Sequence, residues 1–417
     1  MSVRLPARRL GVASVAALSC FALAACNASS ADPGSSAEGQ NGSSATPGGS
    51  SQGGDSSSPD DAVDSVTKPT VSTNVRKGAT GVPVSTLVEV SATDGALTSV
   101  KVSSSAGQLA GSLSSDGASW TAQDRLEPDT TYTVKATAAG SQEGSTSRKV
   151  SRFTTEALTL AQQTYPSVAP LAGETVGVGM PVIVTFDLPV TNEAAFEKQM
   201  SVTSVPKQAG AWHWLSNTEA HWRPKNYWKA GTQVSVDVGV NGVDAGNGIY
   251  GQEDRTVDFE VGDTHIYRVD AQTHQMKVFS NGKLLRTIPI TTGKPGFVTR
   301  SGTKVIIEKF ESKRMNSETV GITGSEAYDL DDVKYAMRLT YSGEFIHAAP
   351  WSVGSQGYAN VSHGCTGMST DQAAWLYAMT RRGDVVEYTG TDRPMEFTNG
   401  YGDWNENFAQ YAKGSAL

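Results

Sequence analysis

One cysteine in this chain has the neighbours that a catalytic thiol needs. The sequence contains 3 cysteines, and only Cys365 lies beyond the first 26 residues. Residues 362–367 read Ser-His-Gly-Cys-Thr-Gly, and His347 lies a short distance upstream. A cysteine nucleophile requires a base or cation that favours the thiolate, and a third group that orients the base. The two histidines therefore make thiol chemistry the first hypothesis.

These residues also have ordinary structural interpretations. A lone histidine is usually structural, and a buried, inert cysteine is common. An unpaired thiol in an exported protein is nevertheless a liability unless it performs chemistry, because oxidising compartments favour disulfides. Gly364 and Gly367 would also let backbone amides approach the oxygen of a tetrahedral intermediate. The combination predicts a nucleophilic Cys365 served by His347 or His363.

The N-terminus accounts for the other cysteines and for export. Arginines precede an apolar stretch, 10–25, which suits a signal peptide better than a membrane span. Residues 23–26 read Leu-Ala-Ala-Cys, which resembles a bacterial lipobox. Residues 1–26 are thus predicted to be a lipoprotein signal peptide, with Cys26 lipidated and held on the outer face of the membrane by acyl chains. The alternative is an ordinary secretory signal that happens to contain a cysteine.

The composition favours a β-rich extracellular protein of two to four domains. The chain has 417 residues, 43 of them glycine, and only 18% are charged. The net charge of −8 argues against nucleic-acid binding, since no basic surface is available to neutralise phosphates. Residues 27–66 are rich in Ser and Gly and contain no aromatic residue. They are predicted to form a disordered tether with an r.m.s. span of about 35 Å.

Two successive segments are predicted to be immunoglobulin-like β-sandwiches. In 67–157, apolar residues alternate with polar ones, and turn signals recur about every 8–12 residues. Residues 158–262 repeat this plan at a period of about 100 residues. The second segment holds four tryptophans, which either pack in the core or stack on glycan or a neighbouring module: Trp212, Trp214, Trp222 and Trp228. Its loop Asp244–Gly248 could hold calcium, but a glycine-rich turn is the better interpretation because only one carboxylate is present.

The region 263–389 contains the candidate chemistry and is predicted to be mostly β with one main helix. Its strand-like runs occupy 265–269, 275–280, 284–291 and 303–308. The helix begins after Ser369, whose hydroxyl is a good N-cap, and is expected to end just before Gly383. Residues 390–417 are expected to be a C-terminal tail that packs on the catalytic domain.

The residues around Cys365 resemble a known family signature. His347 followed by Ser-His-Gly-Cys at 362–365 closely resembles the signature of YkuD-type L,D-transpeptidases of the bacterial cell wall. Thr292–Phe297 and Ser301–Thr303 match earlier motifs of that family. The runs 341–347 and 349–354 resemble its actinobacterial branch, which combines a lipobox, two immunoglobulin-like modules and this catalytic domain.

The resemblance implies a role for each residue near the thiol. Cys365 is implied as the nucleophile, and His347 as its proton acceptor and donor. The backbone carbonyl of Ala348 would orient His347. The family often has Ser at this position, but Ala should be equivalent because the backbone carbonyl makes the contact. The amides of His363, Gly364 and Cys365 would form the oxyanion hole.

A lidded substrate cleft also follows from the resemblance. Tyr328 and Met315 match the lid. The other implied substrate contacts are Ser342, Gly343, Trp351, Ser362 and Gly367. Relatives commonly carry Asn or Arg at the position of Gly367, so a side-chain hydrogen bond to substrate is lost or supplied elsewhere. We expect this to affect substrate preference more than catalysis.

The implied activity is acyl transfer between peptidoglycan stem peptides, without metal or cofactor. Cys365 would attack the third residue of a donor tetrapeptide and release D-Ala, and an acceptor amine would complete a 3→3 cross-link. A carbapenem would acylate the same thiol. A monomer is expected, working in the cell wall from its membrane anchor. Two alternatives stay open: an L,D-carboxypeptidase on the same domain, and a non-enzymatic wall-binding lipoprotein.

Overall fold

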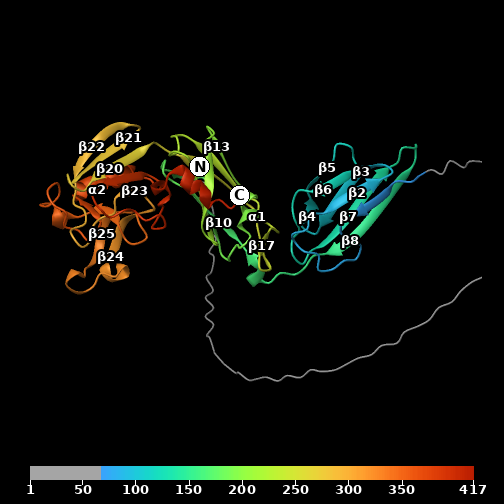
Figure 1. Cartoon of the computed structure of the whole chain (residues 1–417), viewed down its shortest axis with the longest axis horizontal. Coiled ribbons are helices and arrows are strands. Elements are labelled where there is room, and N and C mark those ends of the chain that lie inside the picture. Colours follow the sequence, from blue (N-terminus) through green and yellow to red (C-terminus); the bar gives the residue numbers. More distant parts are fainter. Residues whose placement is uncertain (1–66) are drawn as a thin grey trace, which may run out of the picture. The chain divides into compact units, whose positions relative to one another are not determined.

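The computed structural model describes residues 67–417 (Figure 1), most of whose regular structure is strand. The predicted signal peptide, Cys26 and the predicted tether lie outside the described residues. Within 67–417, no helix is both long and apolar enough to cross a bilayer. The mainly β fold predicted from the sequence, two sandwiches and a β-rich catalytic region with one main helix, is confirmed.

The first sandwich consists of two four-stranded sheets. One sheet has the order β1 (Thr70–Thr73), β2 (Glu89–Thr93), β6 (Ser119–Ala122), β5 (Gly111–Leu113). The other has the order β4 (Gly107–Leu109), β3 (Ala96–Ser104), β7 (Thr131–Ala139), β8 (Thr146–Thr154). Along β7, side chains at alternate positions are buried, among them Tyr132 and Val134, because successive residues of a strand face opposite sides of the sheet.

The second sandwich has a similar two-sheet plan. One sheet has the order β10 (Pro166–Ala169), β12 (Val182–Phe186), β15 (Glu219–Pro224), β14 (Gly210–Ser216). The other has the order β11 (Thr175–Val176), β19 (Arg255–Val261), β16 (Gln233–Val238), β13 (Met200–Val205). The remaining elements are η1 (Leu160–Gln162), α1 (Glu193–Glu197), β9 (Gln163–Thr164), β17 (Asp244–Gly246) and β18 (Ile249–Gly251).

Burial and hydrogen bonding describe the tryptophans and the Asp244–Gly248 loop of the second sandwich. All four tryptophans are buried in a hydrophobic cluster, as the packing interpretation predicts, and this cluster also contains residues from beyond the sandwich. The loop Asp244–Gly248 is a tight turn in which the Asp244 carboxylate accepts the Gly246 amide at 2.8 Å. Asn247 and Gly248 have positive φ angles of 56° and 73°, as a glycine-rich turn requires.

The region 263–389, predicted to be catalytic and called the catalytic region below, has two further sheets and one main helix. The five-stranded sheet has the order β22 (Lys283–Pro289), β21 (Gln275–Ser280), β20 (His265–Asp270), β28 (Val385–Thr389), β23 (Gly302–Val305). The four-stranded sheet has the order β24 (Glu308–Asn316), β25 (Asp329–Arg338), β26 (Phe345–Ala348), β27 (Thr366–Met368). Residues from both sheets and from helix α2 (Thr370–Met379) form one core. The short helices are η2 (Ser317–Val320), η3 (Gly324–Glu326), η4 (Pro350–Ser352), η5 (Asp403–Asn405), α3 (Phe408–Tyr411) and η6 (Ala412–Gly414).

Helix α2 ends earlier than the sequence predicted. The Ser369 hydroxyl accepts the Gln372 amide at 3.4 Å, as expected of the N-cap. At the other end the backbone turns extended at Thr380. The Thr380 hydroxyl donates to the Leu376 carbonyl at 2.7 Å and contacts the Tyr267 hydroxyl at 2.9 Å. A local bond to Leu376 and a tertiary bond to Tyr267 thus hold Thr380 in the extended conformation that ends the helix before Gly383.

The second sandwich and the catalytic region share a hydrophobic core. Val305, Ile307 and Val385 belong to the same buried cluster as the sandwich tryptophans. The Gly177 amide donates to the Arg382 carbonyl at 2.8 Å, and a Cβ on Gly177 would lie 2.2 Å from the Asp384 nitrogen. The two backbones therefore approach as closely as glycine permits.

The C-terminal tail contacts more than the catalytic region. Part of it bonds to the catalytic region, where Asn405 Nδ2 donates to the Thr303 carbonyl at 2.7 Å. Its end lies against the second sandwich, where His213 Nδ1 is 2.8 Å from the Tyr411 carbonyl. The Arg223 guanidinium lies 4.3 Å from the centre of the Tyr411 ring. Tyr411 of the tail thus contacts residues of both β14 and β15.

Candidate functional site

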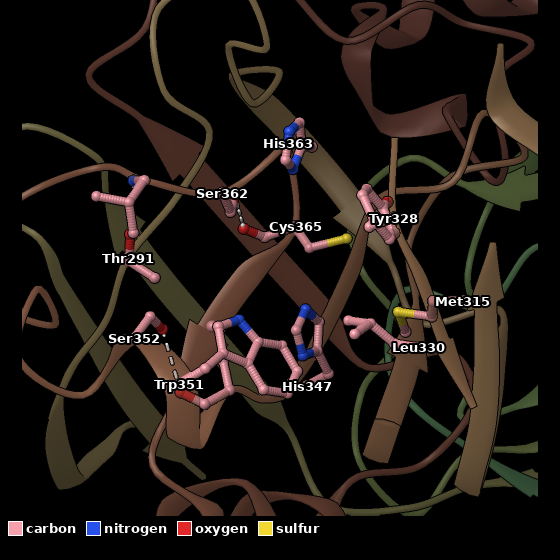
Figure 2. A pocket seen from close by; sticks show the side chains of 13 residues that line it. Thr291, Met315, Tyr328, Leu330, His347, Trp351, Ser352, Ser362, His363 and Cys365 are labelled. Atoms are coloured by element: carbon pink, nitrogen blue, oxygen red, sulfur yellow. Dashed lines mark hydrogen bonds between the residues drawn. The ribbon is translucent and has the colours of Figure 1, made fainter. Parts of the chain in front are cut away.

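Cys365 and His347 line one cavity because two strand segments distant in the sequence pair there. Strands β26 and β27 are parallel, with His347 opposite Gly367, and Cys365 immediately precedes β27. The cavity has a volume of about 310 Å³. Figure 2 shows His347, Trp351 and Cys365 around it, with Met315 and Tyr328 contributed by the hairpin of β24 and β25, residues 308–338, which is called the lid below.

A second cavity, of about 480 Å³, shares residues with the first. Cys365, Met315 and Tyr328 line both cavities. Gly343 lines only the second, together with the cationic side chains Lys313, Arg314 and Arg338. The thiol therefore lies between two cavities. The lid residues Met315 and Tyr328 line both of them.

The hydrogen bonding of His347 defines its tautomer. Its Nδ1 lies 2.8 Å from the Ala348 carbonyl oxygen, which can only accept, so Nδ1 carries the proton and Nε2 keeps its lone pair. Burial lowers the pKa of His347 below its ordinary value. A neutral imidazole with an unprotonated Nε2 is the form that can take a proton from a thiol.

Burial also favours the neutral form of the Cys365 thiol. Burial raises the pKa of its thiol to about 12; the Phe345 amide and Lys304 lower the pKa, and Glu344 raises it. The thiol donates a weak hydrogen bond to the Gly343 carbonyl, with S and O 3.5 Å apart. A thiol and imidazole that are both neutral favour proton transfer during attack over a preformed ion pair.

The Gly364 amide is not free to donate to an oxyanion, contrary to what the family resemblance had implied. Its amide donates to Ser362 Oγ at 3.1 Å, and its carbonyl accepts the Thr299 hydroxyl at 2.8 Å. The Ser362 hydroxyl in turn donates to the Cys365 carbonyl at 2.6 Å. The Gly364 amide is thus already engaged in this loop. Its φ of +123° suits glycine, which explains the residue type without an oxyanion role.

The structure brings together most, but not all, of the implied substrate contacts. The first cavity is lined by Met315, Tyr328, Trp351, Ser362, His363 and Gly367. Ser342 lines neither cavity, because Asn399 of the tail accepts its amide at 2.9 Å and donates to its hydroxyl at 2.8 Å. A Cβ on Gly367 would lie 2.9 Å from the Ala349 Cβ, so a larger residue there would require this wall to move.

Several residues of the site had no signal in the sequence. Leu330 lines the first cavity from the lid strand β25. Behind Cys365, the fully buried Lys304 is paired with Glu344, whose other oxygen accepts Arg300 at 3.0 Å. Burial lowers the pKa of Lys304 to about 8 despite this pairing. The family motifs include Ser301–Thr303 and Tyr341–His347. No local pattern in the sequence indicated that Arg300, Lys304 and Glu344 contact one another.

Known proteins are similar to this chain over much of its length. Residues 264–387 match the L,D-transpeptidase catalytic domain family (YkuD), and residues 79–244, which include parts of both sandwiches, match a bacterial Ig domain family. L,D-transpeptidase 2 of Mycobacterium tuberculosis is 38% identical, over 84% of this chain and 85% of the relative. L,D-transpeptidase 1 of the same species is 39% identical, over 54% of this chain and 84% of the relative. A solved structure of the LD transpeptidase LdtMt1 in complex with imipenem is 40% identical over 54% of this chain and 97% of that one, with a TM-score of 0.48.

Proposed function

The chain belongs to the L,D-transpeptidase family, and from this premise we propose that it cross-links peptidoglycan through a thioester on Cys365. The observation that supports this mechanism is the shared cavity of Cys365 and a neutral His347 whose Nε2 can accept a proton. The chain is an enzyme of peptidoglycan metabolism. The nucleophile, the 3→3 linkage and the release of D-Ala belong to the proposal.

In the acylation half-reaction, the thiol turns from the Gly343 carbonyl and gives its proton to His347 Nε2. The sulfur attacks the carbonyl of the third-position diamino acid in the donor tetrapeptide. Amides of His363 and Cys365 stabilise the tetrahedral oxyanion. The C–N bond then breaks, the protonated His347 gives the proton to the departing D-Ala amine, and a thioester remains.

In the second half-reaction, the side-chain amine of an acceptor stem attacks the thioester carbonyl. The C–S bond breaks, the amine loses a proton through His347, and the sulfur is protonated again. The two cavities that adjoin Cys365 support separate places for donor and acceptor. The 3→3 cross-link and a neutral thiol are the products.

The alternative on the same domain is an L,D-carboxypeptidase, in which water takes the place of the acceptor amine. The deciding experiment incubates a disaccharide-tetrapeptide with the soluble protein and analyses the products by mass spectrometry. A dimer that has lost one D-Ala supports the transpeptidase. A tripeptide alone would establish the carboxypeptidase, and unchanged substrate would contradict both.

We also propose that the protein is a membrane-anchored monomer. Lipidated Cys26 would anchor it, the tether 27–66 would span into the wall, and the modules 67–157 and 158–262 would position the catalytic domain 263–389 with its tail 390–417. A C26A variant should lose detergent-phase partitioning and keep its activity. Partitioning equal to that of the wild type would contradict the anchor.

The shared core predicts what happens when the modules are removed. A fragment of 263–417 would expose Val305, Ile307 and Val385, which the second sandwich otherwise covers. We expect this fragment to be less soluble than one beginning at 158.

A further inference from the structure

We propose that Glu326, Lys294 and His363 form a clasp that holds the lid over Cys365 and thereby favours an amine over water as the acceptor. The term clasp refers below to these three residues alone. The proposal assigns Glu326 as a positioning residue, since it acts through its neighbours. Its statement about the acceptor rests on the proposed function, whereas its statement about lid closure does not.

The clasp joins three separate segments at one carboxylate oxygen. Glu326 Oε2 accepts Lys294 Nζ at 2.6 Å and lies 2.7 Å from His363 Nε2. Glu326 belongs to η3 in the lid, Lys294 to the loop after β22, and His363 lies two residues before the nucleophile. One lid side chain is therefore bonded to both a cavity-lining residue and the opposite loop.

Aromatic contacts support the same closure. The His363 ring lies 4.7 Å from the Phe297 ring and 5.1 Å from the Tyr328 ring. Tyr328 follows Glu326 by two positions in the lid. The Glu326 carboxylate is bonded to the His363 ring, and the Tyr328 ring packs against that same ring. The clasp therefore restrains Tyr328 beside the thiol.

The electrostatics favour an ionised carboxylate in the clasp. Lys294, and to a smaller extent His363, holds the pKa of Glu326 below its usual range. The side chains are 40% exposed for Glu326, 31% for Lys294 and 23% for His363. A partly exposed cluster of this kind can open and close, and its substitution leaves the hydrophobic core untouched.

Closure would matter most after the thioester has formed. Met315 and Tyr328 line both cavities beside Cys365, so a lid held down keeps the acyl group under these two apolar side chains. When the lid is up, water reaches the thioester carbonyl, the C–S bond breaks, and a tripeptide carboxylate and a thiol result. When the lid is down, the acceptor amine attacks instead.

The first experiment measures lid closure without any substrate. Cys365 of the soluble protein is alkylated with bulky fluorescein maleimide and, separately, with small iodoacetamide. The measured ratio is the rate with fluorescein maleimide divided by the rate with iodoacetamide. In E326Q and K294M we expect this ratio to rise about two- to fivefold, the range for losing a partly exposed ion pair. The double variant should show no further rise, because both substitutions break the same contact. D332N is the matched control, since Asp332 pairs with Lys334 at 2.7 Å on the exposed face of the same hairpin.

A wild-type ratio in E326Q would overturn the clasp, as would an equal rise in D332N. The second experiment compares the products of the disaccharide-tetrapeptide reaction. E326Q should raise the ratio of tripeptide to dimer, and D332N should not. An unchanged ratio despite faster labelling would overturn the role in acceptor choice. If the wild type forms neither product, the proposed function fails, and the labelling ratio still decides whether the clasp closes the lid.

Discussion

Two buried histidines of this protein have pKa values shifted in opposite directions, and the difference separates the imidazole proposed to act in catalysis from a structural one. His347 beside the thiol bonds only a backbone carbonyl, and burial lowers its pKa. His221 on β15 lies between Asp403 at 2.9 Å and Glu219 at 2.8 Å. Burial alone would lower the pKa of His221, but the two carboxylates outweigh it and raise the pKa to about 9.

The surroundings of His221 explain why it is charged. Asp403 belongs to the C-terminal tail, and its Oδ1 also accepts the Tyr411 hydroxyl at 3.2 Å. The Nδ1 bond to Asp403 thus joins the second sandwich to the tail, while Nε2 is bonded to Glu219 of the same strand. The comparison shows that burial decides only how costly a charge is, whereas the hydrogen-bond partners decide whether the charge is present.

The comparison of His347 with His221 assumes that His347 takes the proton of a nucleophilic Cys365. C365A should abolish both cross-linking and the covalent carbapenem adduct, because the nucleophilic atom is gone. C365S should be nearly as inactive, since an imidazole activates a hydroxyl far less readily than a thiol. Intact-protein mass spectrometry with a carbapenem provides the measurement. An adduct on C365A at the normal rate would return Cys365 to a structural role.

The next largest effect concerns the base. H347A should slow carbapenem acylation by about 10²–10⁴-fold, the usual contribution of a positioned proton acceptor. H221Q is the control, because its side chain lies outside both cavities and should leave the acylation rate unchanged. Equal losses in the two variants would mean that the effect of His347 is on folding rather than chemistry.

The pH dependence of acylation tests the same histidine in the wild type. A protonated imidazole cannot accept the thiol proton, and burial lowers the pKa of His347 below its ordinary value of 6.5. The acid limb of the acylation rate should therefore lie below pH 6.5. Stopped-flow carbapenem acylation between pH 4 and 8 would show it. An acid limb centred above pH 6.5 would contradict a lowered pKa.

The smallest expected effect is on stability, at His221. A pKa raised to about 9 from 6.5 stabilises the fold fully below pH 6.5, and the contribution disappears as the pH rises to about 9. It amounts to roughly 3 kcal/mol, since one pKa unit corresponds to about 1.4 kcal/mol. H221Q should therefore unfold at lower denaturant concentration at pH 6, with a smaller difference at pH 9.5. A deficit that is the same at both pH values would contradict the charged imidazole.

The sequence was informative wherever a function depends on residues that are close together in the chain. Period-two alternation predicted strands such as β7, and the Ser369 cap predicted the start of α2. The motif around Cys365 and His347 identified the family, and the pairing of β26 with β27 then placed the two residues in one cavity. Such signals are local, because side-chain alternation, caps and turns depend on a few neighbouring residues.

Only the tertiary structure decided which distant side chains meet. Nothing near Ser342 indicated that Asn399 would draw it away from the cavities, and nothing near Glu326 indicated His363 as its partner. The protonation of His221 likewise depends on a carboxylate from the tail. Contacts of this kind follow from how sheets, lid and tail pack, and the pKa of a buried group follows from those contacts. The residue types were therefore readable from the sequence, while their charge states and partners were set by the fold.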